Sequence, residues 1–499
     1  MTTAYDLVYV RKEEEPILAP PRSEVGVMGW LLGNLLSSFT NMLLTVFGIA
    51  FLFWAIPPTV EWALINAVWI GDSRDACLAP EAGACWAFVE AKFGQFMYGR
   101  YPVDERWRVD LTAILLVAGL VPIAIPRVPF KRANAIFLLL VFPIVALILL
   151  TGGNFGISVW AMLFLVAIGC VATGLIAMAS SDGSSPMAAR VVAPVAAALA
   201  VAAFVASYFV DFGDAAFLGV TMPVLIAACG AMALASLVAG AAAIASGRGF
   251  PGAGAALSTW VLISALVLVA TLLAADFGLR WVETPLWGGL LITLVVAVVG
   301  IVGSMPLGVV LALGRRSKLP VVKFICIVFI EFVRGVPLIT VLFMASVMLP
   351  LFLPPGVNFD KLLRALIGVT LFAGAYMAEV VRGGLQAIPR GQYEAAQAVG
   401  LNYWKTMRLI ILPQALKIVI PGIVNSFISL FKDTSLVLII GIFDLLGIVQ
   451  FNFTDANWAS PKTPATGYVF AALVFWAFCF GMSRYSIYTE RRLDTGYRR

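Results

Sequence analysis

The sequence contains no histidine and little charge of either sign. Asp, Glu, Lys and Arg make up 12% of the 499 residues, whereas soluble globular proteins carry roughly 25%. Because 62% of the residues are hydrophobic, polar groups cannot cover a folded surface, and we expect lipid to be the solvent. The lack of histidine removes the commonest metal ligand and the readiest proton relay. We therefore expect neither a metal site nor a His-based proton pump.

Two further features are missing. No G-x-x-x-x-G-K-S/T segment is present, so this chain lacks a nucleotide phosphate-binding loop and is not expected to be an enzyme. The N-terminus mixes Arg11 and Lys12 with three glutamates and has no small-residue cleavage site, which argues against a cleavable signal peptide. The net charge of +6 needs no nucleic-acid partner, because basic residues set membrane topology.

Long apolar stretches dominate what is present. A helix crosses the hydrocarbon core of a bilayer with about 20 apolar residues. By this measure we predict an all-α polytopic membrane protein with about twelve transmembrane helices. Their expected centres lie near residues 47, 118, 143, 168, 200, 230, 265, 300, 335, 373, 430 and 477.

The basic residues of the short loops predict the orientation. If the N- and C-termini are both cytoplasmic, the cytoplasmic loops are basic and the opposite short loops are poor in Lys and Arg, as the positive-inside rule requires. The expected cytoplasmic residues are Arg127, Lys131, Arg132, Arg190, Arg248, Arg315, Arg316, Lys318, Arg390, Lys405, Arg408, Lys417, Arg491, Arg492, Arg498 and Arg499.

Two regions differ in the charge of their spans. Residues 1–280 hold about seven spans rich in Ala, Val and Gly, with a long periplasmic loop near 57–110. From residue 281 to 499 the spans contain acidic and basic side chains, which are expensive at membrane depth and tend to mark function. We therefore predict a domain boundary near residue 280.

A cytoplasmic segment, residues 390–413, predicts a helix-turn-helix elbow. Glu394, Ala395 and Ala396 lie in a good helix-forming stretch, and Gly400 suits the left-handed conformation that ends a helix. A second short helix is expected to follow, with Pro413 stopping or kinking it. A short helix with a small-residue face fits a groove on a partner protein.

This segment resembles the EAA loop of ABC importer permeases, whose pattern reads E-A-A, three residues, G, nine residues and I-x-L-P. Every fixed position matches, including Ile410, Leu412 and Pro413. The likeness to the polar amino-acid branch extends over 289–316, 330–338, 375–384 and 432–436, and the long N-terminal extension is similar to the M-type permease of general L-amino-acid importers. The resemblance implies a C-terminal five-helix type I ABC importer permease core in the bacterial inner membrane.

The resemblance also implies partners. Cytoplasmic ABC ATPase subunits would use ATP and Mg, with no cofactor on this chain, and would receive Glu394, Ala395, Ala396, Gly400, Ile410, Leu412 and Pro413 at the elbow. A second permease subunit would complete the pore, favouring a heterodimer, and a periplasmic amino-acid-binding protein would deliver the L-amino acid. The alternative is an ion-coupled secondary transporter of small solutes, which inverted repeats would support. The two halves instead differ in composition, because only the C-terminal spans contain charged side chains.

Charged residues within the spans are candidates for the translocation path. Glu331 and Arg334 share a helix face and precede Gly335 and Pro337, a pattern typical of broken helices that line a cavity, although an ion pair that tightens packing explains the two charges equally well. Glu379 and Arg382 repeat the spacing nearer the cytoplasm, where an interfacial ion pair is favoured.

Four polar residues, Lys432, Asp433, Thr434 and Ser435, interrupt a later span. Lys432 and Asp433 supply both signs for a zwitterionic amino acid, but adjacent helical residues point about 100° apart. One can face the path while the other makes a structural contact, and a purely structural role is the alternative.

Two cysteines, Cys77 and Cys85, fall in the loop expected in the periplasm, where disulfides persist. A structural disulfide is the favoured interpretation over a redox role. The tryptophans of the same region fit an aromatic belt at the membrane interface better than a docking face for a binding protein.

Overall fold

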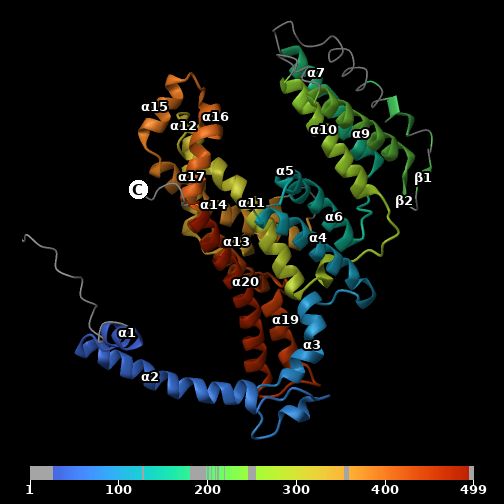
Figure 1. Ribbon diagram of the computed structural model, residues 1–499. Coiled ribbons are helices and arrows are strands. Elements are labelled where there is room, and N and C mark those ends of the chain that lie inside the picture. Colours follow the sequence, from blue (N-terminus) through green and yellow to red (C-terminus); the bar gives the residue numbers. More distant parts are fainter. Residues whose placement is uncertain are drawn as a thin grey trace, which may run out of the picture. The chain divides into compact units, whose positions relative to one another are not determined.

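The computed structural model describes residues 26–125, 128–179, 198, 202–203, 205–207, 210, 213–217, 220–245, 254–352 and 359–493. Within these residues the chain is almost entirely helical, which confirms the predicted all-α class (Figure 1). Contacts divide the chain into two compact units, one of Met1–Ala91 with Asn452–Phe470 and the other of Lys92–Phe451 with Ala471–Arg499. The boundary near residue 280 stays a prediction.

Seven helices of the described residues are long and apolar enough to cross a membrane. There are eight if the bent pair of α12 (Pro320–Gly335) and Leu338–Phe352, which begins with α13 (Leu338–Phe343), forms one span. The seven are α2 (Phe39–Val60) with the π-turn Glu61–Ile65, α4 (Arg106–Ala124), α5 (Lys131–Ile136) with the π-turn Phe137–Val141 and α6 (Phe142–Thr151), α11 (Gly289–Arg315), α14 (Lys361–Ala387), α18 (Ile420–Asp433) with the 3-10 turn Thr434–Ile440, and α20 (Thr463–Leu493).

Three more apolar helices are α7 (Val159–Ala179), α9 (Val224–Ala245) and α10 (Gly254–Ala274). Every expected span centre falls in one of the apolar helices, except the centre near residue 200, which lies outside the described residues.

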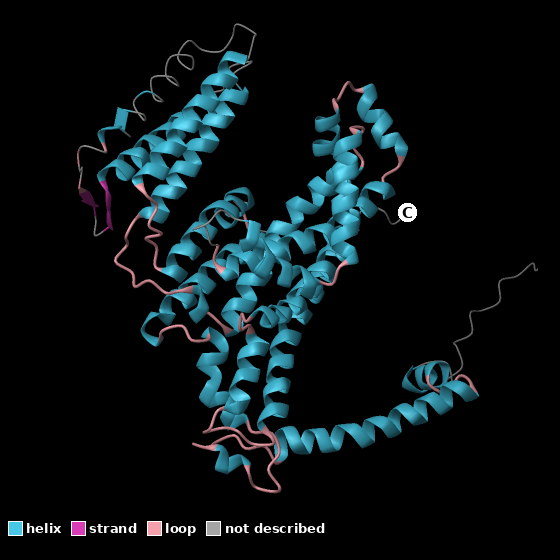
Figure 2. Cartoon of the chain, turned by 180° about the vertical axis from the view of Figure 1, so that it is seen from behind, coloured by secondary structure: helices cyan, strands magenta, loops and turns pink. Residues whose placement is uncertain are grey.

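Between α7 and α9 two short strands, β1 (Asp214–Phe217) and β2 (Val220–Pro223), pair antiparallel with Asp214 opposite Pro223 (Figure 2). The expected cytoplasmic residues Arg127, Arg190, Arg248, Arg498 and Arg499 also lie outside the described residues.

The segment 57–110, expected as a loop, is partly helical. α2 continues through Pro57 and Pro58, whose carbonyls still accept the Glu61 N–H, so the prolines remove donors without ending the helix. The rest of the segment contains α3 (Trp86–Tyr98), the start of α4 and two 3-10 turns (Arg74–Cys77 and Val103–Glu105), joined by loops. Cys77 and Cys85 form a disulfide with Cα atoms 5.7 Å apart.

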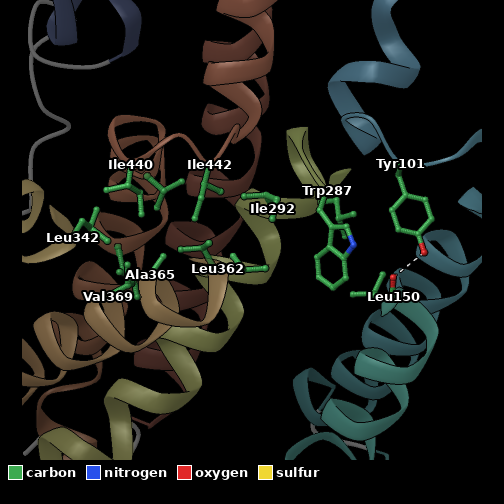
Figure 3. Packing of buried hydrophobic residues seen from close by; sticks show 14 of the residues in the cluster. Tyr101, Leu150, Trp287, Ile292, Leu342, Leu362, Ala365, Val369, Ile440 and Ile442 are labelled. Carbon is green, nitrogen blue, oxygen red and sulfur yellow. Dashed lines mark hydrogen bonds between the residues drawn. The ribbon is translucent and has the colours of Figure 1, made fainter. Parts of the chain in front are cut away.

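A buried hydrophobic cluster joins helices from both sides of residue 280 (Figure 3). Trp287 before α11, Ile292 of α11 and Ala365 of α14 pack in the same cluster as Tyr101 and Leu150. The Tyr101 hydroxyl donates to the Leu150 carbonyl at 3.0 Å. Residues of the N-terminal extension therefore help to build a hydrophobic core of the second unit.

Small residues let α11 and α14 cross closely. A Cβ atom on Gly308 would lie 2.6 Å from Cγ of Met377, and one on Gly374 would lie 2.5 Å from Cδ2 of Leu307. Helices in membranes associate through such close van der Waals packing, since lipid gives no hydrophobic driving force between them. This crossing fixes the two helices whose ends near the elbow carry the candidate site.

Candidate functional site

The predicted elbow, residues 390–413, begins with α15 (Arg390–Ala398). Gly400 has φ +77°, its N–H donates to the Gln397 carbonyl at 2.9 Å, and the Leu401 N–H donates to the Ala396 carbonyl at 3.1 Å. These two hydrogen bonds form a Schellman motif, which ends a helix with one left-handed residue. A Cβ on Gly400 would meet nothing within 4 Å, so backbone conformation alone requires glycine here.

The second arm of the elbow starts at Asn402, whose side chain accepts the Lys405 N–H at 2.9 Å as an N-cap. It runs through α16 (Tyr403–Thr406) and a π-turn (Met407–Ile411) into α17 (Leu412–Ile418). Pro413 was expected to stop or kink this helix. The chain stays helical through Pro413, so the proline does not stop it, and a π-turn (Met407–Ile411) directly precedes the proline.

The inner face of this arm is buried against the spans. Met407, Ile411 and Ala415 belong to one hydrophobic cluster with residues of α11, α12 and α14. A Cβ on Gly384, near the end of α14, would lie 2.6 Å from the Ala415 carbonyl oxygen. The arm is therefore held tightly on the ends of the spans, and Figure 1 shows α15, α16 and α17 together beyond the end of α14.

The outer face is exposed and partly apolar. Of the seven elbow residues assigned to docking, Glu394, Ala395, Gly400 and Pro413 are exposed, whereas Ala396 is buried and Ile410 and Leu412 are half-buried against the cluster. Sequence reasoning missed four exposed apolar side chains, although the aromatic pair after Gly400 was a signal for them. They are Val399 (79% exposed), Tyr403, Trp404 (71% exposed) and Leu409.

Five charged residues form one network across α11, α12 and α14. A terminal nitrogen of Arg315 lies 2.8 Å from Glu331 and 2.7 Å from Glu379, and Arg382 lies 2.7 Å from Glu379. Arg334 lies farther away, 4.0 Å from Glu331 and 3.9 Å from Glu379. The two predicted i,i+3 pairs are therefore parts of a single charge network. Its short links between helices run through Arg315, which the sequence indicated only as a topology signal.

The network lies next to a broken helix. α12 and the helix that follows meet at 107° across Gly335 and Pro337, as the sequence predicted for a Pro in this position. The Arg334 guanidinium lies over the Tyr376 ring at 5.6 Å, within the range of a cation–π contact. The same arginine therefore contacts α14 at the point where α12 ends.

The run Lys432 to Ser435 lies where α18 becomes the 3-10 turn. Lys432 is exposed, Asp433 and Ser435 are half-buried and Thr434 is buried, with both hydroxyls donating to carbonyls of their own helix. Among the described residues, no ion pair or hydrogen bond links this run to Glu331 or Arg334. The six candidate path residues thus fall into two separate groups.

An apolar hollow of about 440 Å³ is lined by α13, the helical turns after it and Ile439, and contains none of the candidate path residues. Across the described part of the chain, no cluster of Cys, Asp or Glu is arranged to hold a metal ion.

Comparison with known proteins places these features in a family. Residues 304–495 match the family described as the binding-protein-dependent transport system inner membrane component. The chain is 41% identical to the inner membrane amino-acid ABC transporter permease protein YhdY of Escherichia coli, covering 96% of this chain and 97% of the relative. It is also 41% identical to the glutamate/glutamine/aspartate/asparagine transport system permease protein BztC of Rhodobacter capsulatus, covering 99% of this chain and 100% of the relative.

Among solved structures, a crystal structure of an amino acid ABC transporter with histidines is 28% identical to this chain, covers 41% of it and 92% of the solved chain, and has a TM-score of 0.36. The full-length relatives and the matching family model identify the chain: it belongs to the family of inner-membrane permease subunits of amino-acid ABC transporters.

Proposed function

We propose that this permease subunit works in an ATP-driven importer that carries L-amino acids into the bacterial cytoplasm. The observation that supports it best is the elbow, which has a buried face against the spans and an exposed apolar face toward the surroundings. A contiguous apolar surface outside the spans is typical of a protein interface. ATPase subunits bind this face, hydrolyse ATP with Mg, and move the elbow.

The remaining partners follow from the same proposal. A second permease chain completes the pore, and a heterodimer is favoured by the likeness to M-type permeases. A periplasmic binding protein supplies the amino acid, and both termini of this chain are cytoplasmic, on the side of the elbow. The relative named for glutamate, glutamine, aspartate and asparagine, 41% identical over 505 residues, supports acidic and amide amino acids as the first substrates to test.

Uptake into vesicles tests the proposal. The chain is purified from its native membrane with whatever subunits accompany it, reconstituted, and given radiolabelled glutamate with the binding protein and ATP. The expected result is uptake that requires ATP and survives an ionophore that collapses ion gradients. Uptake that needs a gradient and ignores ATP would establish the ion-coupled transporter, which the relatives do not support.

A further inference from the structure

The C-terminal end of α11 carries two consecutive arginines that face different elements. α11 ends at Arg315, and Arg316 follows as its C-cap with φ −93°. Side chains of successive residues at a helix end point about 100° apart, so one helix end can contact two neighbours. Arg315 contacts the charge network, and Arg316 contacts the elbow.

Arg316 joins the elbow to the end of α14. Its terminal nitrogen donates to the Tyr393 hydroxyl at 3.2 Å and to the Leu385 carbonyl at 3.1 Å, and its guanidinium lies over the Tyr393 ring at 5.7 Å. Leu385 is in the last turn of α14, where carbonyls lack helical donors. Tyr393 is in α15, and its hydroxyl lies 3.4 Å from the same carbonyl.

Arg315 joins the same helix end to the broken helix. One of its nitrogens reaches Glu331 of α12 and Glu379 of α14 at hydrogen-bond distance, and Glu331 lies one turn before the break at Gly335. The helices also approach closely here, because a Cβ on Gly314 would lie 2.4 Å from Sγ of Cys326 in α12. The Glu379 side chain is 16% exposed, so water competes weakly for that link.

These contacts differ in kind from the hydrophobic packing around them. Apolar packing is non-directional, whereas a guanidinium is a rigid plane whose donors fix both distance and orientation of their acceptors. Directional contacts therefore run from Tyr393 of α15 through Arg316 and Arg315 at the end of α11 to Glu331 of α12.

We infer that Arg315 and Arg316 are positioning residues that transmit movement of the elbow to the break in α12. This inference rests on the proposed function, because it assumes that an ATPase moves the elbow. It predicts that either arginine can be altered without preventing ATP hydrolysis, while the amount of amino acid carried for each ATP falls.

The test measures that ratio in reconstituted complexes of the full chain with its partner subunits. Arg315→Gln and Arg316→Gln are expected to lower transport per ATP by about fivefold or more, the lower end of typical coupling effects. Assembled complex should stay at the level of the unaltered protein. The double variant should be no worse than the poorer single variant, because the two residues act in series.

Lys318→Gln is the matched control. The substitution removes one positive charge two residues after Arg316, and the Lys318 side chain makes no ion pair or hydrogen bond with the described residues. Tyr393→Phe removes only the hydroxyl that Arg316 contacts, and it should lower the ratio in the same direction.

Three results would overturn the inference. They are an unchanged transport per ATP in the arginine variants, an equal loss of transport per ATP in Lys318→Gln, or a smaller amount of assembled complex that still carries the normal amount of amino acid for each ATP. If the arginine variants do not assemble, Tyr393→Phe decides the matter, and a normal ratio there also overturns it. The unaltered complex is measured first. Uptake there that does not need ATP refutes the proposed function itself.

Discussion

At the scale of single residues, the charge network explains how acidic groups are accommodated at the ends of three spans. Glu379 is mostly buried and contacts Arg315 and Arg382 at 2.7 Å, so its charge is compensated from two helices. A buried carboxylate without such partners is costly, because desolvation disfavours the charged form. The network therefore serves stability as well as any role in transport.

The network alters the outcome expected for Glu331 and Arg334. As an isolated buried pair they would be interchangeable, and reversing both charges would restore the protein. Glu331 instead lies 2.8 Å from Arg315 and only 4.0 Å from Arg334. Glu331→Arg combined with Arg334→Glu would set two guanidiniums against each other at Arg315, so we expect the double variant to melt no higher than Arg334→Glu alone. Recovery of the melting temperature in the double variant would show that the pair is independent of Arg315.

Gly400 offers a test of backbone conformation without a steric contribution. Gly400→Val is expected to abolish uptake while the chain still reaches the membrane, because a left-handed conformation costs a β-branched residue at least about 1–2 kcal/mol. Gly391→Val is the control, since a Cβ there also meets nothing within 4 Å and the residue is helical with no positive φ. Uptake and membrane content are measured together. Normal uptake by Gly400→Val would contradict the role of this turn.

At the scale of elements, one helix outside the spans has a buried aspartate, Asp444, directly before its first residue. Asp444 precedes α19 (Leu445–Phe451), and its carboxylate accepts the N–H groups of Gly447 at 2.9 Å and Leu446 at 3.1 Å. Burial raises the pKa of Asp444 from 3.8 to about 6, against the opposing effect of these backbone donors. The fold thus binds the proton more tightly than the unfolded chain does.

This raised pKa makes the stability of the fold depend on pH. A raised pKa in the folded state contributes stability that is fully present below pH 3.8 and is lost as the pH rises to about 6. We expect Asp444→Asn, which keeps an acceptor and has no charge, to remove this part of the pH dependence and to be no less stable at pH 7. Melting temperatures of both proteins between pH 4 and 7 measure it, and parallel curves would contradict the assignment.

At the scale of the whole molecule, the N-terminal extension contributes to the core of the second unit. Tyr101 is buried in the cluster with Trp287 and Leu291 of the permease region. Arg108 of α4 is fully buried, lies 3.2 Å from Glu105 and donates to the Arg280 carbonyl at 3.1 Å. The part of the extension from Lys92 onward is therefore a structural part of that unit.

A substitution in the extension should consequently destabilise the permease region. Tyr101→Ala is expected to cost about 3–5 kcal/mol, as for other large aromatic residues removed from a core. Tyr101→Phe loses only the hydrogen bond to the Leu150 carbonyl and is expected to cost about 1 kcal/mol. Denaturant titration in detergent, followed by fluorescence of the tryptophans, gives both values. Equal stability of Tyr101→Ala and the unaltered protein would show that the cluster is not shared.

The sequence by itself determined the features that depend on local composition and spacing. Apolar runs located the spans, because membrane thickness sets the length of a crossing helix. The E-A-A, Gly and I-x-L-P spacing indicated the family, which the full-length relatives confirm. Gly400 and the break at Pro337 were predictable because each depends on the backbone of one or two residues.

Only the tertiary structure decided which side chains meet across helices. Arg315 looked like a topology signal, and its contacts with Glu331 and Glu379 arise because the close packing of α11, α12 and α14 brings residues 16 and 64 positions away to one nitrogen atom. Helix crossing also buried Ala396 while leaving Trp404 exposed, which the motif could not distinguish. Periodicity specifies the faces of one helix, whereas packing between helices determines what each face contacts.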